Sequence, residues 1–437
     1  MKYFGTDGIR DKAQVILKKK YGYYLGKALK LIKKNKKTIF IARDTRDLGK
    51  EIVEDIKKGL FESGINVYDL GVFPTPVLAY FSFVKKTFGI MVTASHNPYH
   101  DNGIKIFNKG VKLYGKHESI IEDVIDKKII VEEKDVFGLE KTFKKPLEKY
   151  MSLYEGLLNK VDLKICLDLA NGAAVSTAAA VFKHITDDLI ILANQPNGKN
   201  INKNCGSTHL KPLQKAVLDH ECDLGVAFDG DADRLMVIDH KGNICDGDLI
   251  IYLFASYLKA HKELKNKFVA LSKMCNIGII NALRIKGIDV IETEVGDKYI
   301  VKAIEENGGI LGGENSGHII NKKLFVSGDG VLNAAFLIHV LDYYKVPLEN
   351  LSHQVKYYPD KLVNIKNIDK SLASHPKVID KVNHFKRILG NDGKILVRPS
   401  GTEPLIRVSV SASTEREVNE ISRSIKDLLE TLNKGDE

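Results

Sequence analysis

Three aspartates alternate with small residues in the segment Asp229-Gly-Asp-Ala-Asp-Arg234, which lies between two apolar stretches. Alternate side chains of an extended segment share one side, so the carboxylates of Asp229, Asp231 and Asp233 are expected to converge. Carboxylates that close repel one another, and a divalent cation relieves the repulsion. Ligation by oxygen alone suits a hard ion such as Mg²⁺. The segment therefore predicts a magnesium site, and a solvated acidic turn of a β-hairpin remains the alternative.

A calcium-binding EF-hand loop is excluded for this segment. That loop requires Gly at its sixth position and Glu at its twelfth, whereas counting from Asp229 gives Arg234 and His240. An EF-hand also has flanking helices, while residues 224–228 and 235–239 are predicted to be strands.

Ser95 follows an apolar stretch and stands in Thr93-Ala-Ser-His-Asn-Pro98, ahead of two turn-forming residues. The frame lacks both glycines of the G-x-S-x-G nucleophile elbow. Neighbouring side chains of an extended chain point to opposite sides, so His96 is a poor candidate for the base of Ser95. Ser and Asn side chains also bond the backbone in ordinary turns. The local pattern leaves a nucleophile and a structural turn equally open.

The segment Glu314-Asn-Ser-Gly-His318 follows two glycines at a predicted strand end. In an extended conformation Glu314, Ser316 and His318 share one side. A carboxylate and a hydroxyl at this spacing suit pairs of sugar hydroxyls, and His318 can exchange protons near neutral pH. A glycine-rich turn with a structural histidine explains the same residues, and both interpretations stay open.

A fourth polar segment, Arg398-Pro-Ser-Gly-Thr-Glu-Pro404, lies near the C-terminal end of the chain. It offers a guanidinium fork, the hydroxyls of Ser400 and Thr402, and backbone N–H groups made accessible by Gly401. Arg407, on the following predicted strand, adds a second fork. The segment predicts a phosphate cradle, with a surface turn as the alternative.

The composition is that of an ordinary globular protein with more than one core. The 437 residues are 44% hydrophobic and 28% charged. No run approaches the roughly 18 apolar residues of a membrane span, and the first residues lack the apolar centre of a signal peptide. The five cysteines contain no C-x-x-C pair, which argues against a zinc site or a disulfide framework. We therefore expect a cytoplasmic protein without a membrane partner.

The net charge of +10 does not by itself indicate a nucleic-acid partner. The lysines form short scattered groups, such as 18–20 and 33–34, without an aromatic-interleaved stripe. Solvated helix faces explain them better, and the positive field would attract anionic substrates. We expect no nucleic-acid partner.

Strands and helices alternate along the chain in three similar cycles. The first runs from a strand at 38–44 to the strand before Ser95, and the rhythm restarts at 163–169 and again near 249–261. The order of strands and helices repeats, but the amino-acid sequence itself does not. The α/β pattern therefore predicts three mixed α/β units and a smaller C-terminal α+β unit, at 1–150, 151–247, 248–355 and 356–437.

Together and in this order, the four polar segments resemble the active-site loops of the α-D-phosphohexomutase family. They resemble its serine loop at 93–98, its metal loop at 229–234, its sugar loop at 313–318 and its phosphate loop at 398–404. The match covers essentially the whole chain. It implies four domains around a central cleft, with a mobile fourth domain that closes to keep water from the reaction.

Within that family the chain looks most like the bacterial phosphoglucosamine mutase branch. This resemblance is carried by residues 4–10, 197–208 and 295–299. Ala232 stands where the family commonly has glycine, and Asp11 replaces a usual glycine after Arg10. Asn315 replaces the branch's usual glutamine with a shorter amide, which bears on sugar preference rather than on reaction type.

The resemblance implies an isomerase that moves a phosphoryl group through Ser95. Glucosamine 6-phosphate and glucosamine 1-phosphate would interconvert through phosphoserine and glucosamine 1,6-bisphosphate, which also serves as activator, in support of UDP-N-acetylglucosamine synthesis. Ser95 is expected to be exposed at its strand end and to face one Mg²⁺ per chain. The implied metal ligands are Asp229, Asp231, Asp233 and an oxygen of the Ser95 phosphate.

Further residues receive roles from the same resemblance. Lys105, Arg10 and Arg234 offset the charge of the transferring group, since each phosphate brings about −1.5 to −2, and either Lys105 or His318 serves as general acid and base. The remaining implied residues are Glu314, Ser316, His96 and Lys298 for the sugar, and Arg398, Ser400, Gly401, Thr402 and Arg407 for the non-reacting phosphate.

Three other functions remain as alternatives. A phosphoglucomutase or phosphomannomutase of the same family would prefer other sugar phosphates. A metal-dependent phosphatase would release inorganic phosphate and need no bisphosphate. A non-catalytic nucleic-acid binder would use the positive charge, but the acidic segment argues against it. The resemblance also allows a homodimer.

Overall fold

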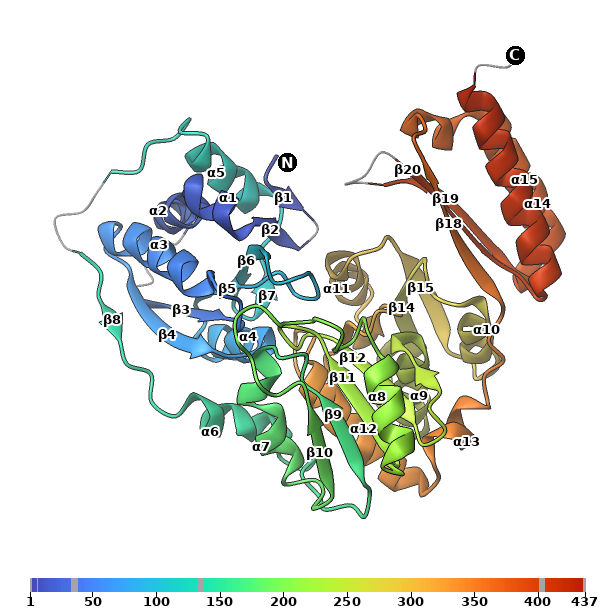
Figure 1. Ribbon diagram of the computed structural model, residues 1–437, viewed down its shortest axis with the longest axis horizontal. Coiled ribbons are helices and arrows are strands. Elements are labelled where there is room, and N and C mark those ends of the chain that lie inside the picture. The colour runs from blue at the N-terminus through green and yellow to red at the C-terminus, as the bar shows by residue number, and fades with distance from the viewer. Residues whose placement is uncertain (1, 6, 33–37, 133–136, 401–404, 435–437) are drawn as a thin grey trace.

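The computed structural model describes residues 2–5, 7–32, 38–132, 137–400 and 405–434. The strands of these residues form four sheets. We call each sheet with its helices a domain, numbered 1 to 4 along the chain. Figure 1 shows the domains in an arc that has domain 1 and domain 4 at its two ends. The predicted fold class, three mixed α/β units and a smaller C-terminal unit, is confirmed.

Domain 1 contains the largest sheet, in the order β1-β2-β6-β5-β3-β4-β8 with β7 paired to β6. Its central strand β3 is buried on both faces, because Ile39 and Ile41 pack towards α2 and α3 while Phe40 and Ala42 pack towards α4. The elements are β1 (Phe4–Gly5), β2 (Gly8–Lys12), α1 (Ala13–Lys18), α2 (Tyr21–Ile32), β3 (Thr38–Arg43), α3 (Gly49–Glu62), β4 (Asn66–Val72), α4 (Thr75–Val84), β5 (Phe88–Val92), β6 (Asp101–Asn108), β7 (Val111–Lys112), α5 (Lys116–Ile125) and β8 (Glu140–Lys141). The helix α6 (Pro146–Tyr150) and the 3₁₀ turn η1 (Met151–Tyr154) connect this domain to the next.

Domains 2 and 3 contain smaller sheets of the same kind. The Ala-rich segment after Gly172 forms a 3₁₀ turn followed by a short α-helix. Domain 2 consists of β9 (Ile165–Asp168), η2 (Ala173–Ser176), α7 (Ala178–Phe182), β10 (Leu189–Leu192), α8 (Lys211–Asp219), β11 (Leu224–Phe228), β12 (Leu235–Asp239) and β13 (Ile244–Cys245). Domain 3 consists of α9 (Gly247–Ala260), η3 (Lys265–Lys267), β14 (Phe268–Ser272), α10 (Ile277–Ile285), β15 (Asp289–Thr293), α11 (Asp297–Glu306), β16 (Leu311–Gly313), β17 (Ile319–Asn321), α12 (Gly330–Tyr344) and α13 (Leu348–Ser352).

The first three sheets repeat one arrangement of strands. Their matching parts have the orders β4-β3-β5-β6, β10-β9-β11-β12 and β15-β14-β16-β17. In each, the first three strands are parallel and the last pairs antiparallel with its neighbour. The three domains therefore share one sheet topology, which the sequence indicated only as a repeated order of strands and helices.

Domain 4 is a three-stranded antiparallel sheet with the order β18-β20-β19, covered by two long helices. Its buried residues form a hydrophobic core of their own, whereas one continuous core joins domains 1, 2 and 3. The elements are β18 (Asp360–Lys366), η4 (Lys370–Ser374), α14 (Pro376–Leu389), η5 (Gly390–Asp392), β19 (Lys394–Pro399), β20 (Leu405–Ser411) and α15 (Glu415–Asn433).

Each of the four polar segments connects two antiparallel strands at the end of a sheet. The serine loop joins β5 to β6, the metal loop joins β11 to β12, the sugar loop joins β16 to β17, and the phosphate loop joins β19 to β20. The first three domains thus present equivalent loops, and their shared core holds these loops against one another.

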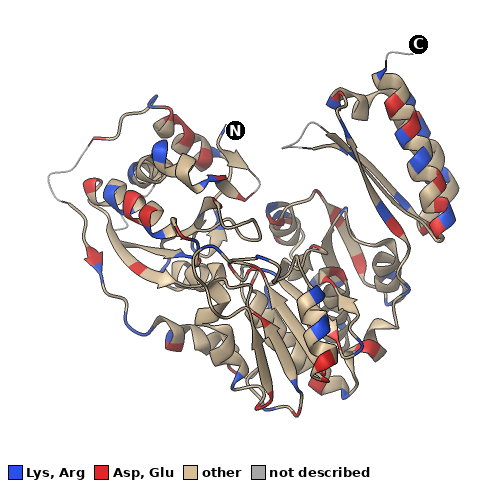
Figure 2. Cartoon of the chain, in the orientation of Figure 1, with Lys and Arg blue, Asp and Glu red and all other residues tan. Residues whose placement is uncertain are grey.

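Charged residues of both signs are distributed over all four domains (Figure 2). Lys and Arg alternate with Asp and Glu along the exposed helices, as on α15. Of the lysine groups named above, Lys18, Lys19 and Lys20 are exposed at the end of α1, and residues 33–34 lie outside the described residues. No helix among the described residues is both long enough and apolar enough to cross a membrane.

Candidate active site

Ser95 lies just beyond β5, in a loop that buried hydrogen bonds hold in place. Its backbone has a left-handed φ of 53°, which non-glycine residues seldom adopt. The Ser95 N–H donates to Thr93 Oγ1 at 2.9 Å. The Arg46 guanidinium donates to the carbonyl oxygens of Ser95 and Asn97 at 2.8 and 2.9 Å, and the Asn202 amide of domain 2 donates to the Ser95 carbonyl at 2.8 Å. Contacts from two domains therefore fix the serine.

The expected exposure of Ser95 is wrong, because its side chain lies in the interior at 1% exposure. The metal loop covers it: a Cβ added to Gly230 would lie only 2.5 Å from the Ser95 carbonyl oxygen. Ser95 does face the aspartates as expected, since its hydroxyl donates to Asp229 Oδ2 at 2.5 Å. Burial also keeps bulk water from the hydroxyl.

His96 is placed poorly for the role of base to Ser95, in agreement with the prediction. Its Nδ1 lies 3.5 Å from Ser95 Oγ, at the limit of a hydrogen bond. Burial, followed by the charges of Arg234 and Arg10, lowers the pKa of His96 to about 4. The imidazole is therefore neutral and a weak base at neutral pH, next to two cations.

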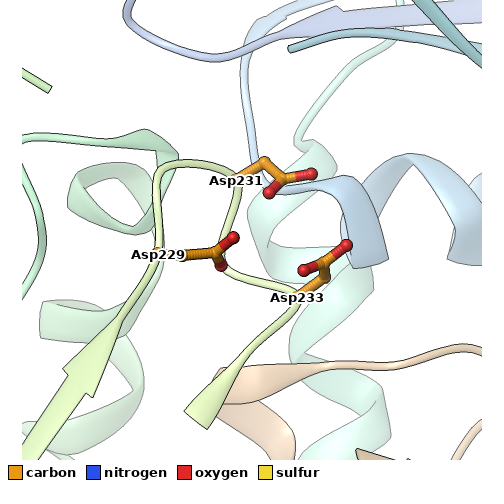
Figure 3. Close-up of side chains that lie close together, drawn as sticks. All are labelled: Asp229, Asp231 and Asp233. Carbon is orange, nitrogen blue, oxygen red and sulfur yellow. The ribbon is translucent and has the colours of Figure 1, made fainter. Parts of the chain in front are cut away.

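The three aspartates converge, but by a turn rather than by extended alternation. The Ala232 N–H donates to the Asp229 carbonyl at 3.1 Å, and Ala232 has a left-handed φ of 58°. That φ explains why glycine suits this position. Figure 3 shows the three carboxylates gathered along one loop. One oxygen from each lies within 4.8 Å of the other two, and all three side chains are buried.

The charges of the three aspartates are costly in this environment. Burial, followed by the charges of Asp231 and Asp233, raises the pKa of Asp229 to about 8. Asp231 Oδ1 is buried and accepts no hydrogen bond from any described residue. Carboxylate oxygens that converge and lack donors are the ligands that a hard divalent cation requires. The residues present therefore fit a metal site.

Lys105, on β6, is an ammonium group buried among carboxylates. Its Nζ lies 2.8 Å from Asp231 Oδ2, 3.1 Å from Asp233 Oδ2 and 3.1 Å from Asp7 Oδ2. Burial lowers the pKa of Lys105, but the charges of Asp231, Asp233 and Asp7 outweigh it and raise the pKa above its usual value. Lys105 is therefore a permanent cation beside the metal loop, as the sequence predicted for its position.

The sugar loop is a tight turn, and the expectation of an extended segment is wrong. The Gly317 N–H donates to the Glu314 carbonyl at 3.0 Å, and a Cβ on Gly317 would lie 2.2 Å from the Leu235 carbonyl oxygen. The sugar loop consequently packs against the end of the metal loop. Glu314 and His318 are buried, while Ser316 is half-buried. The backbone turns back on itself here, because the Glu314 N–H also donates to the His318 carbonyl at 3.2 Å.

His318 lies between two carboxylates. Its Nδ1 is 3.4 Å from Asp233 Oδ1 and its Nε2 is 3.6 Å from Asp297 Oδ2. Burial lowers the pKa of His318, but the charges of Asp233 and Asp297 raise it above the ordinary value. The structure thus brings His318 of domain 3 to the metal loop of domain 2.

Three charged residues at this junction were not predicted as site residues. Lys112 Nζ lies 2.5 Å from Asp7 Oδ1 and 2.5 Å from Asp297 Oδ2, so it bridges domain 1 to domain 3. Asp7 also contacts Lys105 and Arg10. Asp7 and Asp297 lie within residues 4–10 and 295–299, which carry the family resemblance. Their place in those segments could have identified them as site residues. Lys112 carried no local signal.

Asp44, Arg46 and Thr75 also support the site and were not predicted. Arg46 Nε donates to Asp44 Oδ2 at 2.9 Å, which pairs two fully buried charges behind the serine loop. The Thr75 hydroxyl donates to Asp231 Oδ2, and its N–H donates to the Asp231 carbonyl at 3.0 Å. Asp44 and Arg46 could have been identified from the sequence, because they are charged and follow the buried strand β3 directly.

Arg10 and Arg234 border the aspartates, whereas Lys298 does not. Arg10 pairs with Asp7, and Arg234 Nε lies 3.9 Å from Asp229 Oδ2. Burial lowers the pKa of Arg234, but the charges of Asp229, Asp233 and Glu314 outweigh burial and raise the pKa above its usual value. The Lys298 ammonium lies 5.0 Å from the ring centre of Tyr299. Within the described residues no hydrogen bond or ion pair links Lys298 to the aspartates.

The described part of the phosphate loop belongs to domain 4. Arg398 and Arg407 are directly opposite each other on β19 and β20. Burial, followed by the charge of Arg407, lowers the pKa of Arg398. Two guanidinium groups in register favour an anion between them. Ser400 is buried at the end of β19, and the predicted residues Gly401 and Thr402 lie outside the described residues.

Four stretches of the chain match domains of one family. Residues 1–130, 147–242 and 246–358 match the phosphoglucomutase/phosphomannomutase α/β/α domains I, II and III, and residues 362–428 match the C-terminal domain of the same family. The chain therefore belongs to the phosphoglucomutase/phosphomannomutase family, the α-D-phosphohexomutases.

Relatives and solved structures agree with this membership. Phosphoglucosamine mutase of Bacillus cytotoxicus is 38% identical over 439 residues, which cover 98% of each chain. The Pseudoalteromonas translucida enzyme of that name is 36% identical over 99% of this chain and 98% of its own. The fold is similar to that of a phosphoglucomutase/phosphomannomutase family protein from Burkholderia thailandensis, with a TM-score of 0.81, 23% identity, and coverage of 99% and 98% of the two chains.

Replacing Lys112 by Met is expected to lower the free energy of unfolding by about 3–5 kcal/mol, because Asp7 and Asp297 would lose their shared buried cation. Chemical denaturation followed by circular dichroism measures the change. The matched control is Lys116→Met, at an exposed position nearby on α5, where a change within about 0.5 kcal/mol is expected. Equal stability of the two variants would contradict the bridging role of Lys112.

Proposed function

We propose that this enzyme interconverts glucosamine 6-phosphate and glucosamine 1-phosphate, in support of UDP-N-acetylglucosamine synthesis. The observation that carries the proposal is the hydrogen bond of 2.5 Å between the Ser95 hydroxyl and Asp229 of the buried aspartate cluster. The same cluster fits a cation, and Lys105 and Arg234 lie beside it. Phosphoryl transfer depends mainly on such positioning and charge neutralisation.

In the proposed active form Ser95 carries a phosphoryl group. The O1 hydroxyl of glucosamine 6-phosphate attacks the phosphorus, the bond from phosphorus to Ser95 Oγ breaks, and the O1 proton passes to a base. The product, glucosamine 1,6-bisphosphate, turns end for end within the site. Ser95 Oγ then attacks the phosphorus on O6, the bond from phosphorus to O6 breaks, and O6 takes up a proton. Glucosamine 1-phosphate leaves, and Ser95 is phosphorylated again. Added bisphosphate activates the enzyme by phosphorylating a free Ser95.

The charged and polar side chains have different proposed roles in this cycle. Lys105 stays protonated among its carboxylates, so it neutralises charge on the transferring group, together with Arg10 and Arg234. His318 has the lower ordinary pKa and is the proposed proton carrier. Glu314 and Ser316 hold ring hydroxyls, with His96 and Lys298 at the edge of the sugar site. Arg398, Ser400, Gly401, Thr402 and Arg407 hold the phosphate that is not reacting.

Mg²⁺ is the proposed metal, held by Asp229, Asp231 and Asp233. When bound, it supplies positive charge to the phosphate oxygens on Ser95. The chain contributes the three buried carboxylates, the Thr75 hydroxyl that orients Asp231, and a serine loop that is fixed before the substrate arrives.

The sugar is assigned from the relatives rather than from the site. The phosphoglucosamine mutases of Bacillus cytotoxicus and Pseudoalteromonas translucida match nearly the whole chain. A phosphoglucomutase or phosphomannomutase is the second candidate within the family. Comparison of kcat/KM on glucosamine, glucose and mannose phosphates separates the two, and a higher value on glucose or mannose phosphates would overturn the assignment.

Four finer features belong to the proposal. Domain limits near residues 150, 247 and 355 are supported by the four separate sheets. A cytoplasmic location and a homodimer stay predictions, as does the movement of domain 4. The separate core of domain 4 favours such movement, because closing it need not break the core that joins the other domains.

Replacing Ser95 by Ala is expected to abolish mutase turnover and leave the fold intact, because the variant lacks the oxygen that carries the phosphoryl group. Activity is measured with glucosamine 6-phosphate and added bisphosphate, and folding by thermal unfolding. Phosphosite mapping of the unchanged enzyme is expected to find phosphate on Ser95. Substantial residual activity of the variant would overturn the covalent role.

Replacing Thr75 by Val is expected to weaken Mg²⁺ binding by roughly 10- to 100-fold, because Asp231 loses the hydroxyl that orients it. Isothermal titration with MgCl₂ measures the change. Thr75→Ser keeps the hydroxyl and is expected to bind close to the unchanged enzyme. Unaltered Mg²⁺ affinity in the Val variant would show that Asp231 does not depend on Thr75.

A further inference from the structure

A polar cavity lies between domains 3 and 4, and Ser95 is not part of its lining. Its volume is about 300 Å³, at the lower end of the range of small-molecule sites. Domain 3 contributes Asp248 and Asn276, and domain 4 contributes Asp360 and Ser411. Asp246, at the start of α9, also lines it.

The carboxylates of this cavity lack a cation. Within the described residues, Asp246, Asp248 and Asp360 take part in no ion pair. Two lysines, Lys273 and Lys394, line the same cavity, but their ammonium groups pair with Glu294 and Glu292, which are not part of its lining. The negative charge of the wall therefore exceeds its positive charge.

Within the described residues, two buried polar atoms in the wall have no hydrogen-bond partner. Asp248 is 1% exposed, and its Oδ2 accepts the Asn276 N–H at 3.1 Å, while no described donor reaches its Oδ1. Ser411 is 7% exposed, and its hydroxyl likewise has no partner in the described part of the chain. Asp246 Oδ1, by contrast, accepts hydrogen bonds from the Leu249 N–H and the Tyr357 hydroxyl. Buried polar atoms are rarely left unpaired, so the two atoms point to a ligand.

The raised pKa of Asp248 also indicates a ligand. Burial, followed by the charge of Asp246, raises the pKa of Asp248 to about 7, and Lys394 offsets this only in small part. Burial also raises the pKa of Asp246 and Asp360. Such shifts mark carboxylates whose negative charge has no adequate cation beside it.

The geometry favours an organic cation over a metal ion. Among the described residues, the aspartates of the metal loop are the one acidic cluster close enough to share an ion, and the carboxylates of this cavity are not among them. An ammonium group needs one or two acceptors and leaves the rest of a ligand to other contacts. Those contacts are hydroxyls and amides, since Ser409, Ser411, Tyr357 and Asn315 also line the cavity.

We propose that this cavity binds a small primary ammonium compound that carries hydroxyl groups, with its ammonium on Asp248 and its hydroxyls on the serines of domain 4. The ligand contacts domain 3 and domain 4 at once, so it ties the two domains together at their junction. Asn315 of the sugar loop forms part of the same wall. Binding needs no turnover and is separable from the proposed mutase activity.

The test uses free glucosamine as the probe and glucose as its neutral counterpart, with the full-length protein at pH 7. Isothermal titration is expected to detect glucosamine binding and no glucose binding. Asp248→Asn keeps an oxygen for the Asn276 N–H but loses the charge, and it is expected to weaken glucosamine binding by roughly tenfold or more. Ser95→Ala is expected to bind glucosamine as the unchanged protein does.

Two results would overturn the proposal. One is the absence of glucosamine binding to the unchanged protein, shown by circular dichroism to be folded under the same conditions. The other is binding that Asp248→Asn leaves unaltered and that saturating glucose 1,6-bisphosphate, which carries no ammonium, displaces. The second result would assign the glucosamine to the catalytic site.

Discussion

The concentration of buried negative charge at the junction of domains 1, 2 and 3 is the constraint on which the site depends. Asp229, Asp231 and Asp233 are withdrawn from water, and the structure balances them with Lys105, Arg234 and His318. Removing carboxylates from water costs several kcal/mol each unless cations and donors compensate for it. The arrangement is therefore stable only when residues from three domains are assembled together.

The fold meets this requirement by repeating one topology. In each of the first three domains, the loop between one antiparallel pair of strands carries one of the polar segments. A common hydrophobic core holds these domains together, so their loops have little freedom to separate. Domain 4 has its own core and carries Arg398 and Arg407, which suits its proposed role of holding either end of a reorienting bisphosphate.

Local sequence patterns were sufficient for the four segments, for most strands and for the α/β class, since each depends on neighbouring residues. They failed where the chain turns: the aspartates and the sugar loop converge through tight turns, and Ser95 is covered by a domain that lies far from it in sequence. Lys112 could not be predicted, because its partners Asp7 and Asp297 are 105 and 185 residues away. Lys112 meets these two carboxylates only after the chain has folded.

The central claim is that a divalent cation held by the three aspartates touches the phosphate on Ser95. Paramagnetic Mn²⁺ can replace Mg²⁺ at oxygen-ligand sites, and it broadens the ³¹P resonance of a phosphate that it contacts. The most direct measurement is therefore ³¹P NMR of the phosphorylated enzyme during titration with Mn²⁺. The account predicts that the phosphoserine signal broadens beyond detection at one equivalent and reappears when excess Mg²⁺ displaces the Mn²⁺. A phosphoserine signal that stays sharp while Mn²⁺ is bound would contradict it.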